Sequence, residues 1–395
     1  MSPEAALIRE VYRAIVDESL APAAPVAIAS ATLDAFGRQA AIERIPDDFG
    51  TDRAADVAWL ARLASGNDVD RLVEVMAKAS GDPHTIWFSS ERANALFDLA
   101  QGKPARLPGL TLHRDPSGEF VVGDVSPGGA AAQAGVAVGD VVASIDGVPV
   151  TYGGYEIFAL IGRGERPPVL RLIRRSGPVD LVLAMSPCRP PLMETRLLDG
   201  GIGYLRLRFV TLSADPEADC GSLVGRVLAE HRRDGVHSLV LDLRSNPGGY
   251  GVTGVVSQFT RREPLLFYEN ADGTHEAARN TGAGQEFAGK MAILVDEQTL
   301  SSAEMITLSL QELGIARVIG QPTAGGLNVP RLVPLDGGSR LMVPQRRALG
   351  PVSEKAPAGM RVHPDIVVPN RTSADFAEQR DEQLAAAVAT LSAKK

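Results

Sequence analysis

The stretch MAILVDEQTLSSAEMITLSLQE, residues 291–312, decides how the second half of this chain folds. It begins with a short apolar run, Met291–Val295, passes through a polar turn and enters a segment whose apolar residues recur at helical intervals. This pattern predicts a strand, a turn and a helix. Ser301 stands where the turn meets the helix, a place where free backbone N–H groups and the helix dipole favour negative charge. A serine there can become a nucleophile, because nearby N–H groups can hold the oxyanion of an acyl-transfer intermediate.

The same residues also fit an ordinary helix start. Ser301 and Glu304 have the spacing of a capping box, in which the serine caps the helix and the glutamate bonds back to the serine N–H. Such boxes are common at helix N-termini, whereas catalytic serines are rare. Taken alone, the stretch therefore favours capping, and the rest of the sequence has to decide.

Composition sets the broad class. A chain of 395 residues with 45% hydrophobic and 22% charged residues is expected to be globular, with two or three domains. Its net charge of −8, without a basic run, argues against a nucleic-acid partner. Cys188 and Cys220 lack metal-ligand spacing, and the six histidines form no HExxH pattern. We therefore predict neither a metal nor another cofactor.

The first ten residues are polar and acidic, so no signal peptide is visible. The sequence as written is expected to stay in the cytoplasm, or to reach the periplasm if a leader has been removed. No uninterrupted apolar run of about 18 residues predicts a membrane span. The sequence does not indicate an oligomeric state.

Four regions follow from the pattern along the chain. Residues 1–103 show helical apolar periodicity, and residues 104–187 contain short β runs, many glycines and one helical piece at 155–161. In residues 188–373 strands alternate with helices, which predicts a mostly parallel sheet with helices on its faces. Residues 374–395 are predicted to form a C-terminal helix. The fold class is thus a multidomain α/β protein.

Two turns are expected at the carboxyl ends of parallel strands, where active sites of such sheets gather. One precedes Ser301, and the other lies in DLRSNPGGYG, residues 242–251. Its two glycines allow a sharp turn with exposed N–H groups, which could form one arm of an oxyanion hole while the Ser302 N–H forms the other. The alternative is a plain turn.

Residues 124–150, DVSPGGAAAQAGVAVGDVVASIDGVPV, together with the GLTL stretch before them resemble a PDZ domain. In PDZ domains the loop before the second strand holds a peptide's terminal carboxylate, and the peptide adds as a strand. The resemblance assigns this role to Gly109, Leu110, Thr111 and Leu112. The alternative is a PDZ fold kept as a rigid spacer or lid.

The whole set of motifs resembles the S41 peptidases, the tail-specific or C-terminal processing proteases. DPHT, LDLRSNPGG, LVDEQTLSSAE, GQPTAGG and VHPDIVV appear in the family's order between residues 76 and 369. The resemblance implies a ClpP/crotonase-like peptidase core behind the helical region and the PDZ domain. It makes Ser301, rather than Ser302, the nucleophile, with the N–H groups of Gly249 and Ser302 as the oxyanion hole.

The resemblance leaves the general base to be identified. One branch of the family uses a lysine 25 residues after the serine, but Gly326 occupies that place here. The tricorn-like branch takes a histidine before the PDZ domain, which matches His84, and a supporting glutamate, for which Glu354 is the nearest acid. Pro83 replaces the serine that orients the histidine in that branch. Lys355 is the reserve base.

The predicted function is therefore a serine endopeptidase that captures an unfolded protein or peptide by its free C-terminus. Two alternatives remain at this point. One is a pseudo-peptidase that binds peptides without cleaving them, because the lysine is missing and the supporting groups are displaced. The other is an esterase that uses the same serine.

Overall fold

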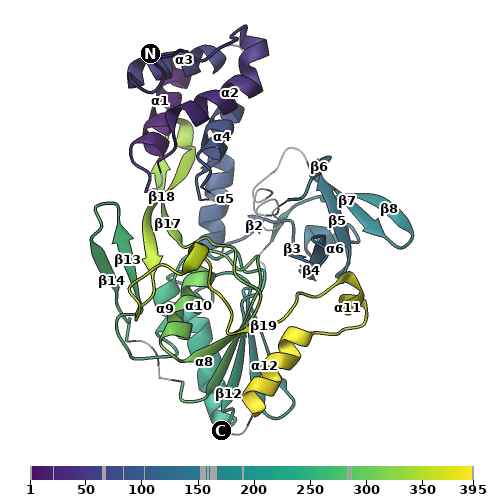
Figure 1. The fold of residues 1–395 in the computed structure, drawn as a ribbon. Coiled ribbons are helices and arrows are strands. Elements are labelled where there is room, and N and C mark those ends of the chain that lie inside the picture. The colour runs from purple at the N-terminus through teal and green to yellow at the C-terminus, as the bar shows by residue number, and fades with distance from the viewer. Residues whose placement is uncertain are drawn as a thin grey trace. The chain divides into compact units, whose positions relative to one another are not determined.

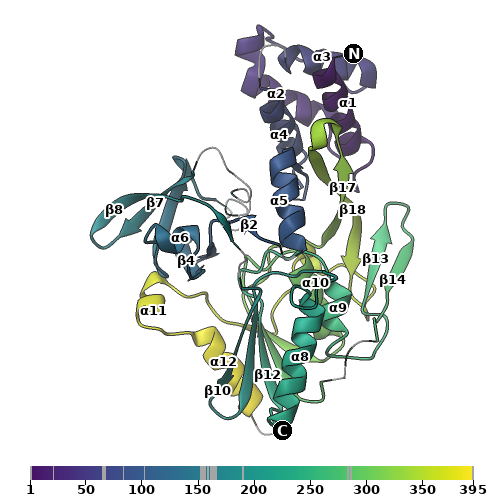
Figure 2. The same ribbon diagram turned by 180° about the vertical axis from the view of Figure 1, so that it is seen from behind.

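The computed structural model describes most of the chain and divides it into two compact units. The described residues are 2–20, 22–64, 68–82, 84–101, 103–151, 157, 160, 167–188, 191–282, 284 and 287–393. The first unit consists of Met1–Ala93, Glu269–His275 and Asn328–Arg347, and the second of Asn94–Tyr268, Glu276–Leu327 and Ala348–Lys395. Figure 1 shows the ribbon and Figure 2 the same ribbon from behind.

Helices from the N-terminus form the body of the first unit. They are α1 (Pro3–Val16), α2 (Pro25–Ala40), α3 (Arg53–Ala64), α4 (Val69–Ala79) and the beginning of α5 (Ser90–Ala100). Ser2 and Asp68 cap α1 and α4 with their side chains, as expected for N-cap residues. The periodic apolar residues predicted from the sequence, among them Ile8 and Val11, are buried in one core.

The N-terminal region is not purely helical, which corrects the sequence prediction. Strand β1 (Ile86–Phe88) pairs antiparallel with β18 (Arg340–Leu349), and β18 also pairs with β17 (Asn328–Pro334). The short helix η1 (Asp336–Gly338) connects the hairpin, and β13 (Leu266–Asn270) and β14 (His275–Ala278) extend the sheet in the order β1-β18-β13-β14. Leu341 and Val343 of the hairpin join the helical core, so a partner from far along the chain makes residues 86–88 a strand.

A PDZ-like sheet begins the second unit. Its order is β3-β4-β5-β7-β8, with β6 paired to β5, and β2 pairs with β9 beside it. The bounds are β2 Ala105–Arg106, β3 Leu110–Arg114, β4 Phe120–Val125, α6 Ala130–Gln133, β5 Val141–Ile145, β6 Val148–Pro149, β7 Val169–Arg174, β8 Gly177–Val182 and β9 Pro187–Cys188. The predicted helical piece at 155–161 lies largely outside the described residues. Alternating apolar residues such as Leu110 and Leu112 fill the core of this domain.

The rest of the second unit is a six-stranded sheet in the order β10-β11-β12-β15-β16-β19. β10 runs antiparallel to β11, and the following pairs are parallel, as predicted. The bounds are β10 Met193–Leu198, β11 Ile202–Leu207, α8 Cys220–Arg233, β12 Ser238–Asp242, α9 Val252–Val256, β15 Lys290–Val295, α10 Ser302–Glu312, β16 Ala316–Gly320, η2 Ala358–Met360, β19 Ile366–Val367, α11 Ser373–Ala377 and α12 Glu382–Ser392.

Helices cover both faces of this sheet. Helix α12 packs against Tyr204, Val240 and Leu294 on one face, and α8, α9 and α10 lie on the other (Figures 1 and 2). The C-terminal helix predicted for residues 374–395 is thus two helices, α11 and α12, and the second belongs to the core of the sheet. The mixed α/β multidomain fold predicted from the sequence is confirmed.

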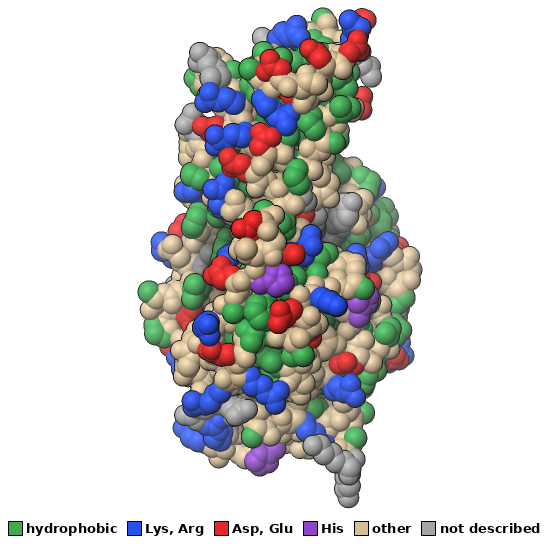
Figure 3. Space-filling model, turned by 60° about the vertical axis from the view of Figure 1, so that its left-hand side comes forward, with side chains coloured by type: hydrophobic (Ala, Val, Ile, Leu, Met, Phe, Trp, Pro, Cys, Tyr) green, Lys and Arg blue, Asp and Glu red, His purple; other side chains and the backbone are tan. Residues whose placement is uncertain are grey.

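The surface carries charges of both signs. On the face drawn in Figure 3, basic and acidic side chains are interspersed with apolar ones. Of the helices that the structure describes, none combines the length and the apolar composition needed to cross a membrane.

Candidate active site

The two turns singled out in the sequence meet at one edge of the parallel sheet. Strands β12 and β15 are neighbours, with Asp242 opposite Leu294, so the turns that follow them leave the sheet side by side. The Leu300 N–H donates to the Asn246 carbonyl at 2.9 Å. The Ser245 N–H donates to the Asp296 carboxylate, also at 2.9 Å. These bonds fix one turn against the other, and both lie at the carboxyl ends of parallel strands, where the sequence predicted them.

Ser301 has an unusual backbone for a helix cap. Its φ of 56° and ψ of −122° differ from the extended conformation that N-cap residues normally adopt. Strained backbone of this kind persists only where its surroundings hold it, and it concentrates at functional sites. The Glu304 carboxylate accepts the Ser301 N–H at 2.9 Å, so the capping pair is present as well. Capping thus holds the serine in place at a sharp turn from strand to helix.

Glu304 does more than cap the helix. It is fully buried and also accepts the Thr323 hydroxyl and the N–H groups of Gly325 (2.9 Å) and Gly326 (2.7 Å). Burial raises the pKa of Glu304, and these donors oppose that shift. The carboxyl group therefore fastens the Gly-Gly turn to the start of α10. Gly326 stands where one branch of the family has its lysine, and here its N–H bonds to Glu304.

The turn after β12 needs two glycines, Gly248 and Gly249, because other backbone and side-chain atoms approach them closely. A Cβ on Gly248 would lie 2.8 Å from the Ser301 Cβ and 2.9 Å from the Ser302 nitrogen. Gly249 has a φ of 134°, and a Cβ there would lie 2.0 Å from the Val210 carbonyl oxygen. The Ser302 hydroxyl donates to the Gly249 carbonyl. Within the described residues neither the Gly249 N–H nor the Ser302 N–H has an acceptor, so both are available to a ligand.

His84 lies in the first unit, in a turn that Asp82 organises. The Asp82 carboxylate accepts the His84 backbone N–H at 2.8 Å and the Asn328 amide at 2.7 Å, and it lies 3.6 Å from His84 Nδ1. Burial would raise the pKa of Asp82, but its contacts with His84 and Asn328 lower it below its usual value. Among the described residues both ring nitrogens of His84 are buried without a hydrogen-bond partner.

Asp82 is a functional candidate that sequence reasoning missed. The DPHT motif contains it, but only the fold shows that its carboxylate lies beside the imidazole. An adjacent carboxylate is the usual group that orients a catalytic histidine. Pro83, expected to occupy the place of an orienting serine, lies outside the described residues. Ser301 belongs to the second unit, so its pairing with His84 stays a prediction.

Glu354 and Lys355 lie at the wrong end of a helix to act on Ser301. They occupy an exposed turn, whose Val352 and Ser353 N–H groups each donate to Glu312 at 3.0 Å. Glu312 is the last of the 11 residues of α10, so about 16 Å of helix separates it from the serine end. Glu354 was the acid nearest to the place where the resemblance expects a supporting glutamate, but its turn contacts the far end of α10. The structure gives neither residue a role at Ser301.

The predicted carboxylate loop of the PDZ domain lies at the edge of its sheet. Gly109 has a left-handed φ of 72°, and Leu110, Thr111 and Leu112 form the first part of edge strand β3. The Ser245 hydroxyl donates to the Leu112 carbonyl at 3.0 Å. Ser245 belongs to the same turn as Gly249. The strand predicted to bind peptide therefore contacts the turn that carries one of the two free N–H groups.

A buried ionic network lies at the end of β12, where the turn that contains Ser245 and Gly249 begins. Arg244 donates to Asp242 (2.6 Å) and to Asp381 (2.9 Å), and the Tyr204 hydroxyl donates to Asp242 at 2.7 Å. Burial alone would raise the pKa of Asp242, but the guanidinium groups of Arg244 and Arg206 and the Tyr204 hydroxyl lower it to about 2. The C-terminal segment thus holds the strand end through Asp381.

This network predicts a specific loss of stability in acid. Because the folded pKa of Asp242 lies below its unfolded value, its contribution is fully present above about pH 4 and disappears as the pH falls towards 2. The difference corresponds to about 2 kcal/mol of the free energy of unfolding. Urea unfolding between pH 5 and pH 2 should show a shallower pH dependence for Asp242→Asn than for the parent chain. The exposed Asp180→Asn should change little, and equal slopes for all three would contradict the prediction.

No metal site accompanies these residues in the described part of the chain, where no three His, Cys, Asp or Glu side chains are grouped to hold an ion. The arrangement at Ser301 has features that acyl transfer requires. A hydroxyl stands at a helix start, beside two N–H groups that have no acceptor among the described residues.

Two family models match parts of this chain, and several curated proteins are similar to it. Residues 201–368 match the model of peptidase family S41, and residues 121–175 match that of the PDZ domain. The carboxyl-terminal-processing protease of Picosynechococcus sp. is 26% identical over 330 residues, which cover 79% of this chain and 77% of that protein. The chloroplastic carboxyl-terminal-processing peptidase 2 of Arabidopsis thaliana is 27% identical, over 69% of this chain but 55% of its own length.

Solved structures agree on the fold. The photosystem II D1 C-terminal processing protease superposes with a TM-score of 0.61 at 20% identity, covering 100% of this chain and 98% of that one. Mature CPAF superposes with a TM-score of 0.57 at 13% identity, covering 95% and 94%. The predicted resemblance to the S41 peptidases and to the PDZ domain is confirmed by the family models and the curated relatives. The finer assignment to the tricorn-like branch rests on the residues alone and stays a prediction.

Proposed function

We propose that this chain, which carries a serine peptidase domain of family S41 and a PDZ domain, is an endopeptidase that captures the C-terminal tail of an unfolded protein and cleaves it at Ser301. The observation that carries the proposal is the junction at the start of α10. There a strained serine adjoins a glycine turn, and two N–H groups in the described structure have no acceptor.

The chemistry follows from these groups. The Ser301 hydroxyl attacks the scissile carbonyl while His84 takes its proton, and the N–H groups of Gly249 and Ser302 hold the oxyanion. His84 then returns the proton to the leaving amine, which frees one product and leaves an acyl-serine. Water hydrolyses the acyl-serine by the same steps. Asp82 would hold the imidazole in orientation through Nδ1.

The oxyanion hole gives a first test. Gly249→Ala should lower kcat by about 10²–10³, the usual cost of losing one oxyanion donor, because the Val210 carbonyl would force the new Cβ and the backbone to move. Gly235→Ala is the matched control, since Gly235 also has a positive φ but a Cβ there meets nothing within 4 Å. Steady-state cleavage of an unfolded protein measures both. A Gly249→Ala enzyme with normal kcat would remove this glycine from the oxyanion hole.

Tail capture gives a second test. A peptide with a free C-terminal carboxylate should bind at least about tenfold more tightly than its C-terminal amide, because the loop at Gly109 would recognise the carboxylate through N–H groups. Fluorescence polarisation with the Ser301→Ala chain measures binding without cleavage. Gly109→Ala should weaken binding, since a Cβ there would lie 3.2 Å from the Gly129 backbone. Gly118→Ala, which meets only the flexible Arg114 side chain, is the control. Equal affinity for acid and amide would contradict tail capture.

Two other functions use the same residues. A pseudo-peptidase would capture tails without reacting, and an esterase would cleave small esters but not proteins. A fluorophosphonate probe distinguishes a pseudo-peptidase from an active peptidase, because the probe labels only a reactive serine. Comparing turnover of an unfolded protein with turnover of a small ester distinguishes an esterase from a peptidase.

A further inference from the structure

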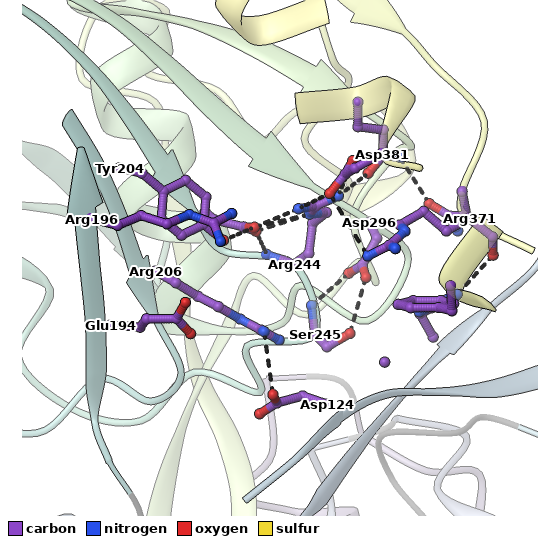
Figure 4. A pocket seen from close by; sticks show the side chains of 16 residues that line it. Asp124, Glu194, Arg196, Tyr204, Arg206, Arg244, Ser245, Asp296, Arg371 and Asp381 are labelled. Carbon is purple, nitrogen blue, oxygen red and sulfur yellow. Dashed lines mark hydrogen bonds and ion pairs between the residues drawn. The ribbon is translucent and has the colours of Figure 1, made fainter. Parts of the chain in front are cut away.

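A charged cavity of about 270 Å³, which Ser301 does not line, lies within the second unit (Figure 4). The PDZ strands β3 and β4 line it with His113, Gly123 and Asp124. Core strands and the Asp242–Ser245 turn form a second wall, and the C-terminal segment from Asn370 to Gln383 forms a third. The cavity is thus built from three parts of the chain that are distant in sequence.

The carboxylates at this cavity already have close donors. Asp124 accepts two hydrogen bonds from Arg208, at 2.9 and 3.0 Å, and Glu194 accepts a third at 3.2 Å. Asp242 and Asp381 share Arg244. Asp296 accepts neutral donors, the Ser245 N–H and hydroxyl among them. Arg208 and Arg244 therefore take up most of the acidic side chains.

Two other guanidinium groups have only longer contacts to these carboxylates, and Arg371 donates one long hydrogen bond, to the Asp375 carbonyl at 3.4 Å. Arg206 comes no closer than 3.6 Å to Asp124, and Arg371 comes no closer than 3.9 Å to Asp381. The Nε atoms of both are buried and have no hydrogen-bond partner among the described residues. A buried donor without an acceptor costs about 1–3 kcal/mol. In Figure 4 the two side chains enter the cavity from opposite sides, with Ser245 between them.

We propose that this cavity binds a small oxyanion, a carboxylate or a phosphate, between Arg206 and Arg371. Planar guanidinium groups recognise such anions with paired hydrogen bonds, and the anion would satisfy the donors that the neighbouring acids do not. Arg196 lies over the Tyr204 ring at 4.4 Å, on an exposed part of the wall, and would supply a third positive charge. The proposal does not require the proposed peptidase chemistry, although Ser245 belongs to the turn that carries Gly249.

The contacts of the cavity walls indicate which parts of the chain a bound anion would connect. His113 Nε2 lies 2.8 Å from the Arg371 carbonyl, and its ring stacks on Phe376 at 4.8 Å. Arg371 is therefore held against the PDZ domain, while Arg206 belongs to the peptidase sheet. An anion that bridges them would join the PDZ domain, the sheet and the C-terminal segment at one point.

The test titrates the full chain at constant ionic strength with two probes, inorganic phosphate and N-acetylglycine. Thermal unfolding and calorimetry should show saturable binding of at least one probe, and N-acetylglycinamide, which lacks the charge, should not bind there. Preference for phosphate would assign a phosphoryl ligand, and preference for N-acetylglycine a chain-end or side-chain carboxylate. Arg206→Gln and Arg371→Gln should each weaken binding by about tenfold or more, as expected for loss of a charge-assisted pair.

Arg279→Gln is the control, because Arg279 is an exposed arginine paired with Glu263 outside the cavity. Arg371→Lys keeps the charge without the planar fork, so it should weaken binding even if the glutamine variants unfold. The proposal is overturned if neither probe binds saturably to the parent chain. It is also overturned if the folded cavity variants bind as the control does.

Discussion

Replacing Ser301 with alanine is expected to abolish proteolysis, with kcat falling by on the order of 10⁴ or more, because the hydroxyl that forms the acyl intermediate is lost and the neighbouring Ser302 hydroxyl is bonded to the Gly249 carbonyl. The Ser301 N–H bond to Glu304 at 2.9 Å does not need the hydroxyl, and loss of the hydroxyl as a helix cap should cost only about 1 kcal/mol. The variant should therefore fold normally and still bind peptide tails. Cleavage of an unfolded protein measures the first effect, and thermal unfolding the second.

Ser309→Ala is the matched control on the same helix. Its hydroxyl donates to the Leu265 carbonyl at 2.7 Å in the core, so its loss should cost about 1 kcal/mol of stability and leave the rate unchanged. Fluorophosphonate labelling should vanish in Ser301→Ala and persist in Ser309→Ala. If Ser301→Ala kept the activity and the label, the nucleophile would be another residue.

Much of the fold could be predicted because local patterns decide it. The short β runs predicted within residues 104–187 and the strands predicted within residues 188–373 are present, among them β5, β7 and β11. Each is a short, strongly apolar or alternating segment bounded by turn residues. The parallel order of β12 and β15 follows from the helices between strands, and it brings the two predicted turns together.

Features that depend on contacts between residues distant in sequence could not be predicted. Strand β1 exists because Ile86 pairs with Met342, a partner that no local pattern indicates. Glu354 was predicted as the nearest acid to the place expected for a supporting glutamate, but the fold places its turn beside Glu312 at the far end of α10. Asp82 and Glu304 were read as parts of a turn and a cap. Their further contacts appear only when His84, Thr323 and the Gly-Gly turn are folded around them.

Removing the imidazole is the second large effect that we expect. His84→Ala should lower kcat about as much as Ser301→Ala does, because a serine without its general base is a poor nucleophile. Groups that act as one unit are not additive, so the Ser301→Ala/His84→Ala double variant should be no slower than either single variant. Lys355→Ala should keep the parental rate. Single-turnover cleavage measures all four chains.

The carboxylate of Asp82, which lies beside the imidazole, gives a further test of the role of His84. If Asp82 orients the imidazole at 3.6 Å, Asp82→Asn should lower kcat and leave KM nearly unchanged, whereas a merely structural role would move stability and KM together. In a His84→Ala background, Asp82→Asn should then have almost no further effect on the rate, because it has no imidazole left to orient. If His84→Ala stays within a few-fold of the parent chain, the base must be sought elsewhere. Additive losses from the Asp82 and His84 variants would separate the two residues.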